Sequence, residues 1–294
     1  TRVTRVIANG IQLEFEERGS ASDPAIVLVR GLGTQLIDWP EAFLSGLMSA
    51  GFRVIVFDNR DVGLSQKFLG LPNLGNVANK TETAPYTIHD MADDILGLMD
   101  SLGIDRAHLF AISMGGMIGQ VLAATQGHRL HSFFSVMSSS SRKGLPTATP
   151  EAAATLRAET DPGAGDEGII AATAEGLRVC GSPGYPLRET DRDRIARSRH
   201  KRDYTPNGVV RQMAAIVAGG NRIELLESIK VPTMVIHGAD DPLIPLAAGR
   251  DTAETIPGAH FEVIQGMGHD LPEGLVPVLI GLVTQFTKSL EQPL

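Results

Sequence analysis

A serine interrupts two apolar runs in the segment "HLFAISMGGMIGQVL" (108–122). Residues 108–112 have the compact apolar character of a buried strand, and residues 114–124 have the spacing of a helix. Ser113 therefore falls on the turn between them. A serine hydroxyl is a poor nucleophile at neutral pH, so hydrolysis there requires a base to take its proton and donors to hold the oxyanion that forms.

The stretch around this serine, "AISMGG", resembles the G-x-S-x-G nucleophile elbow, a sharp turn that presents the serine oxygen at the carboxyl end of a sheet. Small residues two places on either side let the strand and the helix approach each other. Ala111 replaces the first glycine, and its methyl group leaves the turn feasible. The pattern also fits a junction whose small residues only pack, so the assignment depends on the partners of Ser113.

Of the eight histidines, His269 is placed as a base would be. It lies in "VIQGMGHDLP", directly after an expected strand and in a segment too short and too rich in glycine for a helix, which suits an imidazole presented from a loop. His237 ends another strand, where we expect a hydrogen-bonded structural role. The others are expected to pack or to face solvent: His89, His108, His128, His131, His200 and His260.

The acid that orients the base should follow the preceding strand. The segment "VIHGADDPLIP" offers Asp240 and Asp241. Asp241 stands where the chain has turned off the strand, directly before a proline, whereas Asp240 could face solvent or cap the turn. We therefore assign Asp241, which gives the order Ser113, Asp241, His269, the chain order of the α/β-hydrolase triad.

The oxyanion requires two N–H donors. One is expected from Met114, the residue after the serine, and the other from the loop after an early strand. The segment "VLVRGLGTQ" fits that loop, and Leu32 is the best donor because glycines on both sides let the backbone approach a ligand. Gly31 is accordingly expected to lie against the substrate.

The elements that would position these residues alternate along the chain. Apolar runs at 25–31 and 53–61 are typical of strands covered on both faces, and the segment between them has helical spacing that stops at Gly51. An amphipathic helix opened by Thr87 then leads to the strand before Ser113. Strands joined by helices in this way predict a parallel sheet.

The strand rhythm stops after Ser138. A stretch rich in Ser, Pro, Gly and Ala follows, and helical fragments then run to about residue 228, where strands and a closing helix resume. We therefore expect residues 144–227 to form a helical cap inserted into a core made of residues 1–143 and 228–294.

Two features of the expected cap bear on binding. Met213, Ile216 and Val217 lie at helical spacing, so they could cover an apolar pocket or bury their own helix; we name Met213 as a substrate contact. The basic run at 192–202 is expected to be a solvated helix face.

Composition narrows the class of protein. The 294 residues are 43% hydrophobic and 20% charged, enough for one domain or a domain with an insertion. The net charge of −8 repels phosphate backbones, so no nucleic acid partner is expected. The single cysteine, Cys180, excludes an internal disulfide and paired-cysteine zinc sites, and we expect it to be a small buried residue.

No apolar run reaches the roughly 20 residues of a membrane span, and no signal peptide is visible, so the expected location is cytoplasmic. The sequence leaves a monomer and a homodimer equally open.

Five segments together, "LVRGLGTQ", "FDNRDVGLS", "AISMGGMIGQ", "HGADDPLIP" and "GMGHDLP", make the chain resemble an α/β-hydrolase of the esterase and lipase kind. Within that family it is most similar to the aclacinomycin methylesterase group and related bacterial lipolytic esterases. The resemblance is weakest in the cap. It implies an α/β fold with a mostly parallel central sheet flanked by helices and an inserted helical cap. It also implies that Ser113 is the nucleophile, His269 the base and Asp241 its orienting acid. The oxyanion donors would be Leu32 and Met114.

The chain departs from the family pattern beyond Ala111. Arg30 stands where such enzymes usually carry histidine or methionine; a cation there could alter substrate affinity or pair with a carboxylate. Asp58, Arg60 and Ser65 resemble the structural D-x-R-G-x-G-x-S turn of the family, with Asp61 in place of a glycine. We expect that turn to be architectural rather than catalytic.

The leading hypothesis is a serine hydrolase that cleaves methyl or short to medium acyl carboxylic esters through an acyl-enzyme, on a small-molecule substrate and with no metal or organic cofactor. Dehalogenases and epoxide hydrolases of this fold carry aspartate at the position of Ser113 and are excluded. Carbon–carbon bond hydrolases and cofactor-free haloperoxidases or perhydrolases share the same residues, and a non-catalytic ligand receptor on this scaffold is a further alternative.

Overall fold

The structure, a computed structural model, describes residues 2–158 and 161–291. Its strands are β1 (Arg2–Ala8), β2 (Ile11–Arg18), β3 (Ala25–Val29), β4 (Arg53–Phe57), β5 (Ala107–Ile112), β6 (Leu130–Val136), β7 (Thr233–Gly238) and β8 (His260–Ile264). They form one eight-stranded sheet in the order β1-β2-β4-β3-β5-β6-β7-β8. The pairs β1–β2 and β2–β4 are antiparallel and the other pairs are parallel, which confirms the expected mostly parallel sheet.

The hairpin between β1 and β2 was not expected from the sequence. Its turn is Asn9–Gly10, and both residues have positive φ, 50° and 75°. Asparagine followed by glycine is the pair that a two-residue turn with left-handed residues prefers. This dipeptide is therefore the local signal that could have predicted the first strand.

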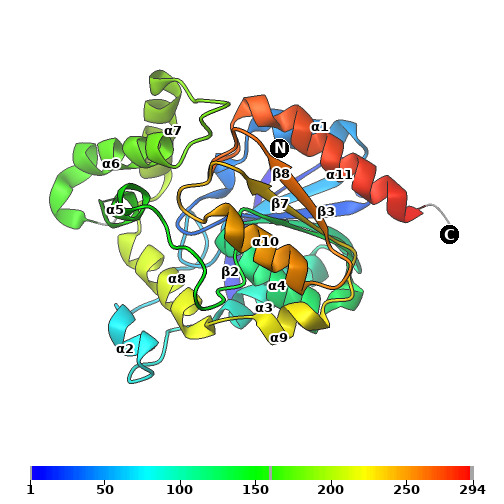
Figure 1. Cartoon of the computed structure of the whole chain (residues 1–294), viewed down its shortest axis with the longest axis horizontal. Coiled ribbons are helices and arrows are strands. Elements are labelled where there is room, and N and C mark those ends of the chain that lie inside the picture. The colour runs from blue at the N-terminus through cyan, green and yellow to red at the C-terminus, as the bar shows by residue number, and fades with distance from the viewer. Residues whose placement is uncertain (1, 159–160, 292–294) are drawn as a thin grey trace.

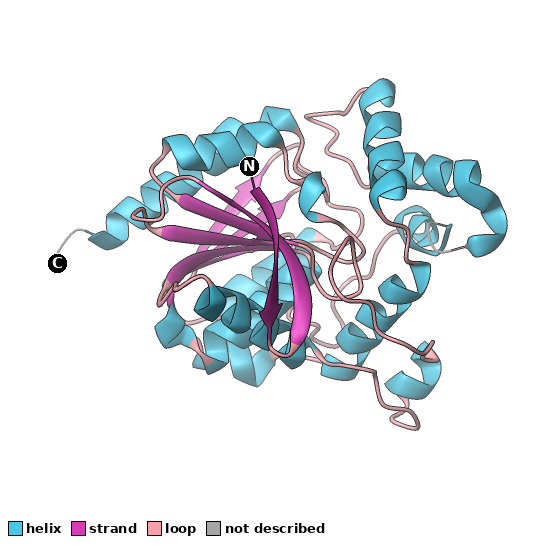
Figure 2. Cartoon of the chain, turned by 180° about the vertical axis from the view of Figure 1, so that it is seen from behind, coloured by secondary structure: helices cyan, strands magenta, loops and turns pink. Residues whose placement is uncertain are grey.

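Helices cover both faces of the sheet. Those flanking it are α1 (Glu41–Ser49), α3 (Ile88–Ser101), α4 (Met114–Thr125), α9 (Ile223–Ser228), α10 (Leu246–Thr255) and α11 (Val276–Glu291). Figure 1 shows α1 and α11 together above the sheet, and α3, α4 and α9 below it. Seen from behind, the strands form one twisted layer between these helices (Figure 2). Each face has its own apolar core, which is why the inner strands are apolar without alternation.

The predicted start of α3 is confirmed. Thr87 accepts a hydrogen bond from the N–H of Asp90, and the Asp90 carboxylate accepts one from the N–H of Thr87. This reciprocal cap satisfies two backbone donors that the first turn of a helix leaves without partners.

A second group of helices lies between β6 and β7 in the chain, where the described residues contain no strand. It consists of α5 (Pro150–Ala158), α6 (Gly165–Val179), α7 (Glu189–Arg202) and α8 (Pro206–Gly219). These helices gather to one side of the sheet layers (Figure 1). The division at residues 144 and 227 stays a prediction. The helix α9, which begins before residue 227, packs against α4 and α10.

The remaining short elements are α2 (Leu74–Ala78) and the 3₁₀ helices η1 (Leu36–Asp38), η2 (Gly127–Arg129), η3 (Pro162–Ala164) and η4 (Glu273–Leu275).

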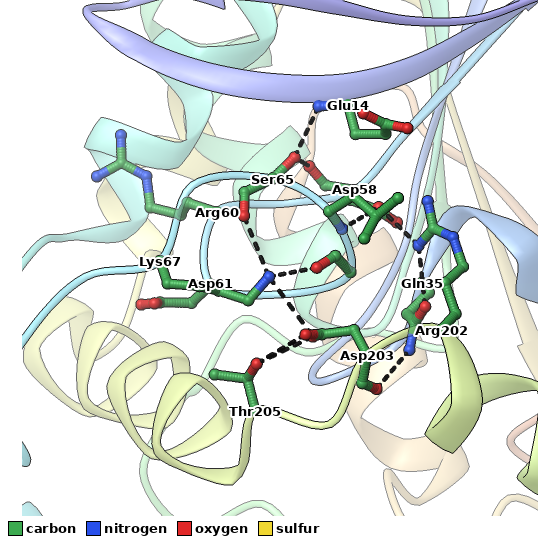
Figure 3. A network of polar contacts seen from close by, with 12 residues as sticks. Glu14, Gln35, Asp58, Arg60, Asp61, Ser65, Lys67, Arg202, Asp203 and Thr205 are labelled. Carbon is green, nitrogen blue, oxygen red and sulfur yellow. Dashed lines mark hydrogen bonds and ion pairs between the residues drawn. The ribbon is translucent and has the colours of Figure 1, made fainter.

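The turn after β4 joins the sheet to the second group of helices (Figure 3). The Asp58 carboxylate accepts a hydrogen bond from the N–H of Leu36 (2.7 Å) and pairs with Nη1 of Arg202 at the end of α7 (2.8 Å). Ser65 Oγ donates to the Asp58 carbonyl oxygen (2.6 Å) and accepts from the N–H of Glu14 (2.9 Å). All these groups are consumed in structural contacts, as expected of an architectural turn.

At position 61 the chain has an aspartate where the family pattern has a glycine, and the structure shows what this aspartate contacts. Its φ of 71° lies in the left-handed region that glycine occupies most easily. Its carboxylate forms a two-bonded ion pair with Arg211 of α8 (2.8 and 2.9 Å) and accepts a hydrogen bond from the Tyr86 hydroxyl (2.6 Å). The aspartate thus adds a buried tie to α8 that a glycine would not provide.

Candidate active site

Ser113 occupies a strained turn directly after β5. Its backbone has φ 54° and ψ −122°, a combination that non-glycine residues adopt rarely. Its N–H donates to the Val136 carbonyl oxygen (2.9 Å), and its own carbonyl oxygen accepts from Ser138 Oγ (2.8 Å) and from the N–H of Met117 (3.2 Å). These bonds hold the strained conformation in place.

The small residues around the serine are required by close approach. A Cβ at Gly115 would lie 2.4 Å from the Val29 carbonyl oxygen, and one at Gly116 would lie 2.6 Å from Ser138 Cβ. Ala111 is fully buried within the core, so its methyl group is accommodated at the position where the family pattern has glycine.

The structure brings together the three side chains selected from the sequence. Nε2 of His269 lies 3.0 Å from Oγ of Ser113, and Nδ1 of His269 lies 2.7 Å from Oδ2 of Asp241. The other carboxylate oxygen, Oδ1 of Asp241, accepts from the N–H groups of Leu243 (2.9 Å) and Ile244 (2.8 Å). These two bonds fix the carboxylate, and through it the ring, so that Nε2 faces the hydroxyl.

Asp240 points elsewhere. It is exposed, and its Oδ2 accepts a hydrogen bond from the N–H of Gly266 (2.9 Å). The choice of Asp241 over Asp240 thus agrees with the positions of the two side chains.

His237 lies behind the acid. Its Nε2 donates to the Ile244 carbonyl oxygen (2.7 Å) and is 3.6 Å from Oδ2 of Asp241. Burial lowers the pKa of His237, so the ring is neutral at physiological pH. It helps to fix the loop that carries Asp241, a structural position like the one expected from the sequence.

The loop after β3 passes directly beside the serine. A Cβ at Gly31 would lie 3.0 Å from Ser113 Cβ and 3.4 Å from its Oγ. Asn59 Nδ2 donates to the Arg30 carbonyl oxygen (3.1 Å), and the N–H of Gly33 donates to Oε1 of Gln212 in α8 (2.9 Å). Neither bond uses the N–H of the intervening Leu32.

Met114, the other expected oxyanion donor, is the first residue of α4. The first four N–H groups of a helix have no acceptor within the helix, and the helix dipole favours negative charge at this end. The N–H of Met114 is therefore suited to an oxyanion next to Ser113.

A cavity of about 1240 Å³ separates the sheet edge from the second group of helices. Apart from Asp241, which lies behind the histidine, all the site residues selected from the sequence line this cavity: Arg30, Gly31, Leu32, Ser113, Met114, Met213 and His269. Ile216 also lines it, whereas Val217 is not among the lining residues. Cys180 is half-buried and lines the cavity, so the expectation of a small buried residue is wrong.

The segment between α6 and α7 holds the histidine loop, a contact that the sequence did not reveal. The N–H of His269 donates to the Cys180 carbonyl oxygen (2.7 Å), and the N–H of Gly268 donates to Ser182 Oγ (2.9 Å). Ser182 Oγ in turn donates to Oδ1 of Asp270 (2.5 Å). Burial raises the pKa of Asp270 to about 6, and its Oδ2 is buried with no hydrogen-bond partner among the described residues.

Within residues 2–158 and 161–291, no group of three or more His, Cys, Asp or Glu side chains is arranged to hold a metal ion. Over the same ranges, no helix combines the length and the hydropathy needed to cross a bilayer.

Comparison with known proteins agrees with this arrangement. Residues 24–273 match the family model for the α/β hydrolase fold. Rhodomycin D methylesterase of Streptomyces peucetius is 25% identical, over 97% of this chain and 98% of the relative. The 3-oxoadipate enol-lactonase 1 of Acinetobacter baylyi is 26% identical, over 96% of this chain and 95% of the relative.

Among solved structures, the enol-lactonase from Burkholderia xenovorans LB400 superposes with a TM-score of 0.75 at 24% identity, covering 97% of this chain and 100% of that one. The resemblance that the sequence motifs carried is confirmed. Because the family model spans most of its length, the chain belongs to the α/β hydrolase fold family.

Proposed function

We propose that this chain is a carboxylic ester hydrolase that works through an acyl-enzyme. Oγ of Ser113 attacks the ester carbonyl carbon while Nε2 of His269 takes its proton. The tetrahedral intermediate collapses when the bond to the leaving alcohol breaks and His269 protonates that oxygen. Water then attacks the acyl group, gives a proton to His269, and releases the acid, after which the proton returns to Ser113.

One observation carries this proposal. A single imidazole lies within hydrogen-bond distance of both a hydroxyl (3.0 Å) and a buried carboxylate (2.7 Å) at the wall of a cavity. In the proposed cycle, the Asp241 carboxylate keeps the proton on Nδ1 of His269 and stabilises the imidazolium that forms. The N–H groups of Leu32 and Met114 would stabilise the oxyanion.

The substrate class rests on the cavity and on the relatives. A volume of about 1240 Å³ exceeds the roughly 300–1,000 Å³ of common ligand pockets, so it has room for an ester with a medium acyl or alcohol group. The relatives named above are a methylesterase and an enol-lactonase, and a methyl ester and a lactone are both carboxylic esters. In this proposal residues 144–227 act as a cap, with Met213 on its apolar lining, and Gly31 borders the ester.

A panel of esters with varied acyl and alcohol halves tests the proposal. We expect hydrolysis of p-nitrophenyl acetate or butyrate, labelling by a fluorophosphonate probe, and loss of both in Ser113→Ala. The matched control is Ser139→Ala, since Ser139 Oγ only accepts a hydrogen bond from the N–H of Ser141 and does not line the cavity. Full activity in Ser113→Ala would reject the assignment.

The same panel separates the alternatives. A ligand receptor would bind an ester and turn none over. A carbon–carbon bond hydrolase would consume vinylogous diketones and leave simple esters nearly untouched. Either outcome would contradict the proposed ester hydrolase.

A further inference from the structure

Arg30 is a buried cation on the wall of the cavity. The residue is 7% exposed, and no carboxylate oxygen of the described residues forms an ion pair with it. Its side-chain hydrogen bonds are long, 3.3 Å from Nε to Thr34 Oγ1 and 3.4 Å from Nη1 to the Asp38 carbonyl oxygen. Typical N–H···O bonds are about 2.9 Å, and a guanidinium has about five N–H donors, so the described residues use little of the hydrogen-bonding capacity of Arg30.

The acids that act electrostatically on Arg30 are Asp38 and Asp270, and neither forms an ion pair with it. Oδ1 of Asp38 bonds Nε of Arg199 (2.6 Å), and Oδ2 of Asp38 accepts from the N–H of Gln35 (2.8 Å). Oδ1 of Asp270 accepts from Ser182, and its Oδ2 has no hydrogen-bond partner among the described residues, Arg30 included. The positive charge of Arg30 is therefore not neutralised by a direct contact on the cavity wall.

The guanidinium is also held in place. It lies over the ring of Trp39, with Cζ 4.8 Å from the ring centroid, which is the geometry of a cation–π contact. One face is thus covered while the residue lines the cavity. A side chain fixed in this way loses little entropy when it binds a ligand.

Arg30 and Ser113 line the same cavity. Arg30 directly precedes Gly31, which also lines it and at which a Cβ would lie 3.0 Å from Ser113 Cβ. Burial lowers the pKa of Arg30 to about 10, so it remains charged at neutral pH. A buried charge is costly unless it is paired, and a planar guanidinium matches a carboxylate with two parallel hydrogen bonds.

We propose that Arg30 is a specificity-determining residue that binds a carboxylate of the substrate. The preferred ester would then carry this carboxylate close enough to its scissile bond for the Arg30 guanidinium to bind it while Ser113 attacks the ester carbonyl. This inference rests on the proposed ester hydrolysis and names its substrate class.

Two pairs of esters with matched shape test it. Ethyl hydrogen succinate and ethyl 4-methylpentanoate differ by a carboxylate against an isopropyl group on the acyl side. On the alcohol side, 3-acetoxypropanoate and 3-methylbutyl acetate differ in the same way. We expect the wild-type chain to prefer the anionic member of at least one pair in kcat/KM by about tenfold or more, which is the size of one charge-assisted contact.

The variant Arg30→Met removes the charge and keeps an unbranched side chain. It should reduce kcat/KM for the preferred anionic ester by about 10-fold to 100-fold, and reduce that for its neutral partner much less. The variant Arg30→Lys should fall between. The control is Arg194→Met, because Arg194 also lines the cavity but is 68% exposed and lies 3.6 Å from Asp191. It should leave the ratio of anionic to neutral rates unchanged.

If Arg30→Met lowered kcat/KM equally for both members of a pair, Arg30 would only support its loop and the inference would fail. A wild-type preference for the neutral ester in both pairs would also overturn it.

A binding measurement needs no turnover: calorimetry of ethyl hydrogen succinate with Ser113→Ala, and with the double variant that also carries Arg30→Met. If binding depends on Arg30 but no ester is hydrolysed, the proposed function fails and the carboxylate site stands. If esters are hydrolysed with no dependence on Arg30, the inference alone fails.

Discussion

Replacing Asp241 by asparagine removes one charge and reverses one hydrogen bond at the centre of the site. Oδ1 of Asp241 accepts from the N–H groups of Leu243 and Ile244, so an asparagine would keep its carbonyl oxygen there. Its NH₂ group would then face Nδ1 of His269, at a place where the carboxylate oxygen now lies 2.7 Å away. An NH₂ group can only donate, so the ring would have to accept at Nδ1 and carry its proton on Nε2.

A proton on Nε2 of His269 faces Oγ of Ser113 across 3.0 Å. The ring could then no longer accept the serine proton. The corresponding change in the triad of a serine protease reduces kcat by about 10⁴-fold, equivalent to about 5.4 kcal/mol of activation free energy. We expect a loss of that order in Asp241→Asn, with a fold that is retained because the two backbone bonds persist.

The assay is kcat/KM with p-nitrophenyl butyrate, with the melting temperature measured in parallel. The control is Asp240→Asn, whose side chain is exposed and bonds only the N–H of Gly266; its activity should stay within about threefold of wild type because exposed substitutions cost little. Activity of Asp241→Asn within tenfold of wild type, or an equal loss in Asp240→Asn, would refute the role of Asp241.

Three other predictions concern the surroundings of the site. Ser182→Ala removes the hydroxyl that accepts from the N–H of Gly268 and donates to the carboxylate of Asp270, so we expect the unfolding free energy to fall by about 1–3 kcal/mol. We also expect kcat to fall by a larger factor than KM rises, and Ser182→Thr to restore part of the loss. An unchanged kcat would show that the contact does not position the histidine. Asp270 binds its proton more tightly in the folded state, with a pKa of about 6 against an ordinary value of about 3.9, so it makes the fold less stable as pH rises from about 4 to about 6. Urea titrations of the wild-type chain should show this loss of unfolding free energy, up to about 3 kcal/mol, and those of Asp270→Asn should not. The same dependence of stability on pH in both proteins would contradict this role of Asp270. Arg211→Met leaves the buried carboxylate of Asp61 without its ion pair, so the unfolding free energy should fall by about 3–5 kcal/mol. Arg178→Met, at a pair with Glu175 that is exposed on both sides, should cost much less, and similar losses in both variants would contradict the structural importance of the buried pair.

The parts of the site that the sequence predicts are those set by local pattern. Ser113, Asp241 and His269 each follow an apolar strand and lie in a turn marked by glycine or proline, so both their element and their edge of the sheet can be inferred. Parallel strands place their carboxyl ends at one edge, which is why residues 128 and 28 positions apart meet there. The first strand was not predicted, although Asn9–Gly10 marks its turn, because residues 2–8 (RVTRVIA) neither alternate strictly between polar and apolar nor form a compact apolar run.

The contacts between the second group of helices and the site loops were not predicted, because they join residues that are far apart in the sequence and follow no repeating pattern. Ser182 reaches Gly268 across 86 positions, and Gln212 reaches Gly33 across 179. A serine or glutamine in the second group of helices and its connecting segments has no local mark that distinguishes such a contact from an exposed side chain. Arg30 was visible as a departure from the family pattern, but its burial and the absence of an ion pair with the described carboxylates follow only from the folded arrangement.

Mass spectrometry tests most directly the central claim, that Ser113 carries the acyl group between the two halves of the reaction. The enzyme would be mixed with p-nitrophenyl butyrate, quenched in acid within the burst, digested and mapped. We predict one butyryl group on the peptide that contains Ser113, and none on that peptide in Ser113→Ala. An acyl group on another residue, or rapid turnover with no acylated peptide under conditions where deacylation limits the rate, would contradict the serine mechanism.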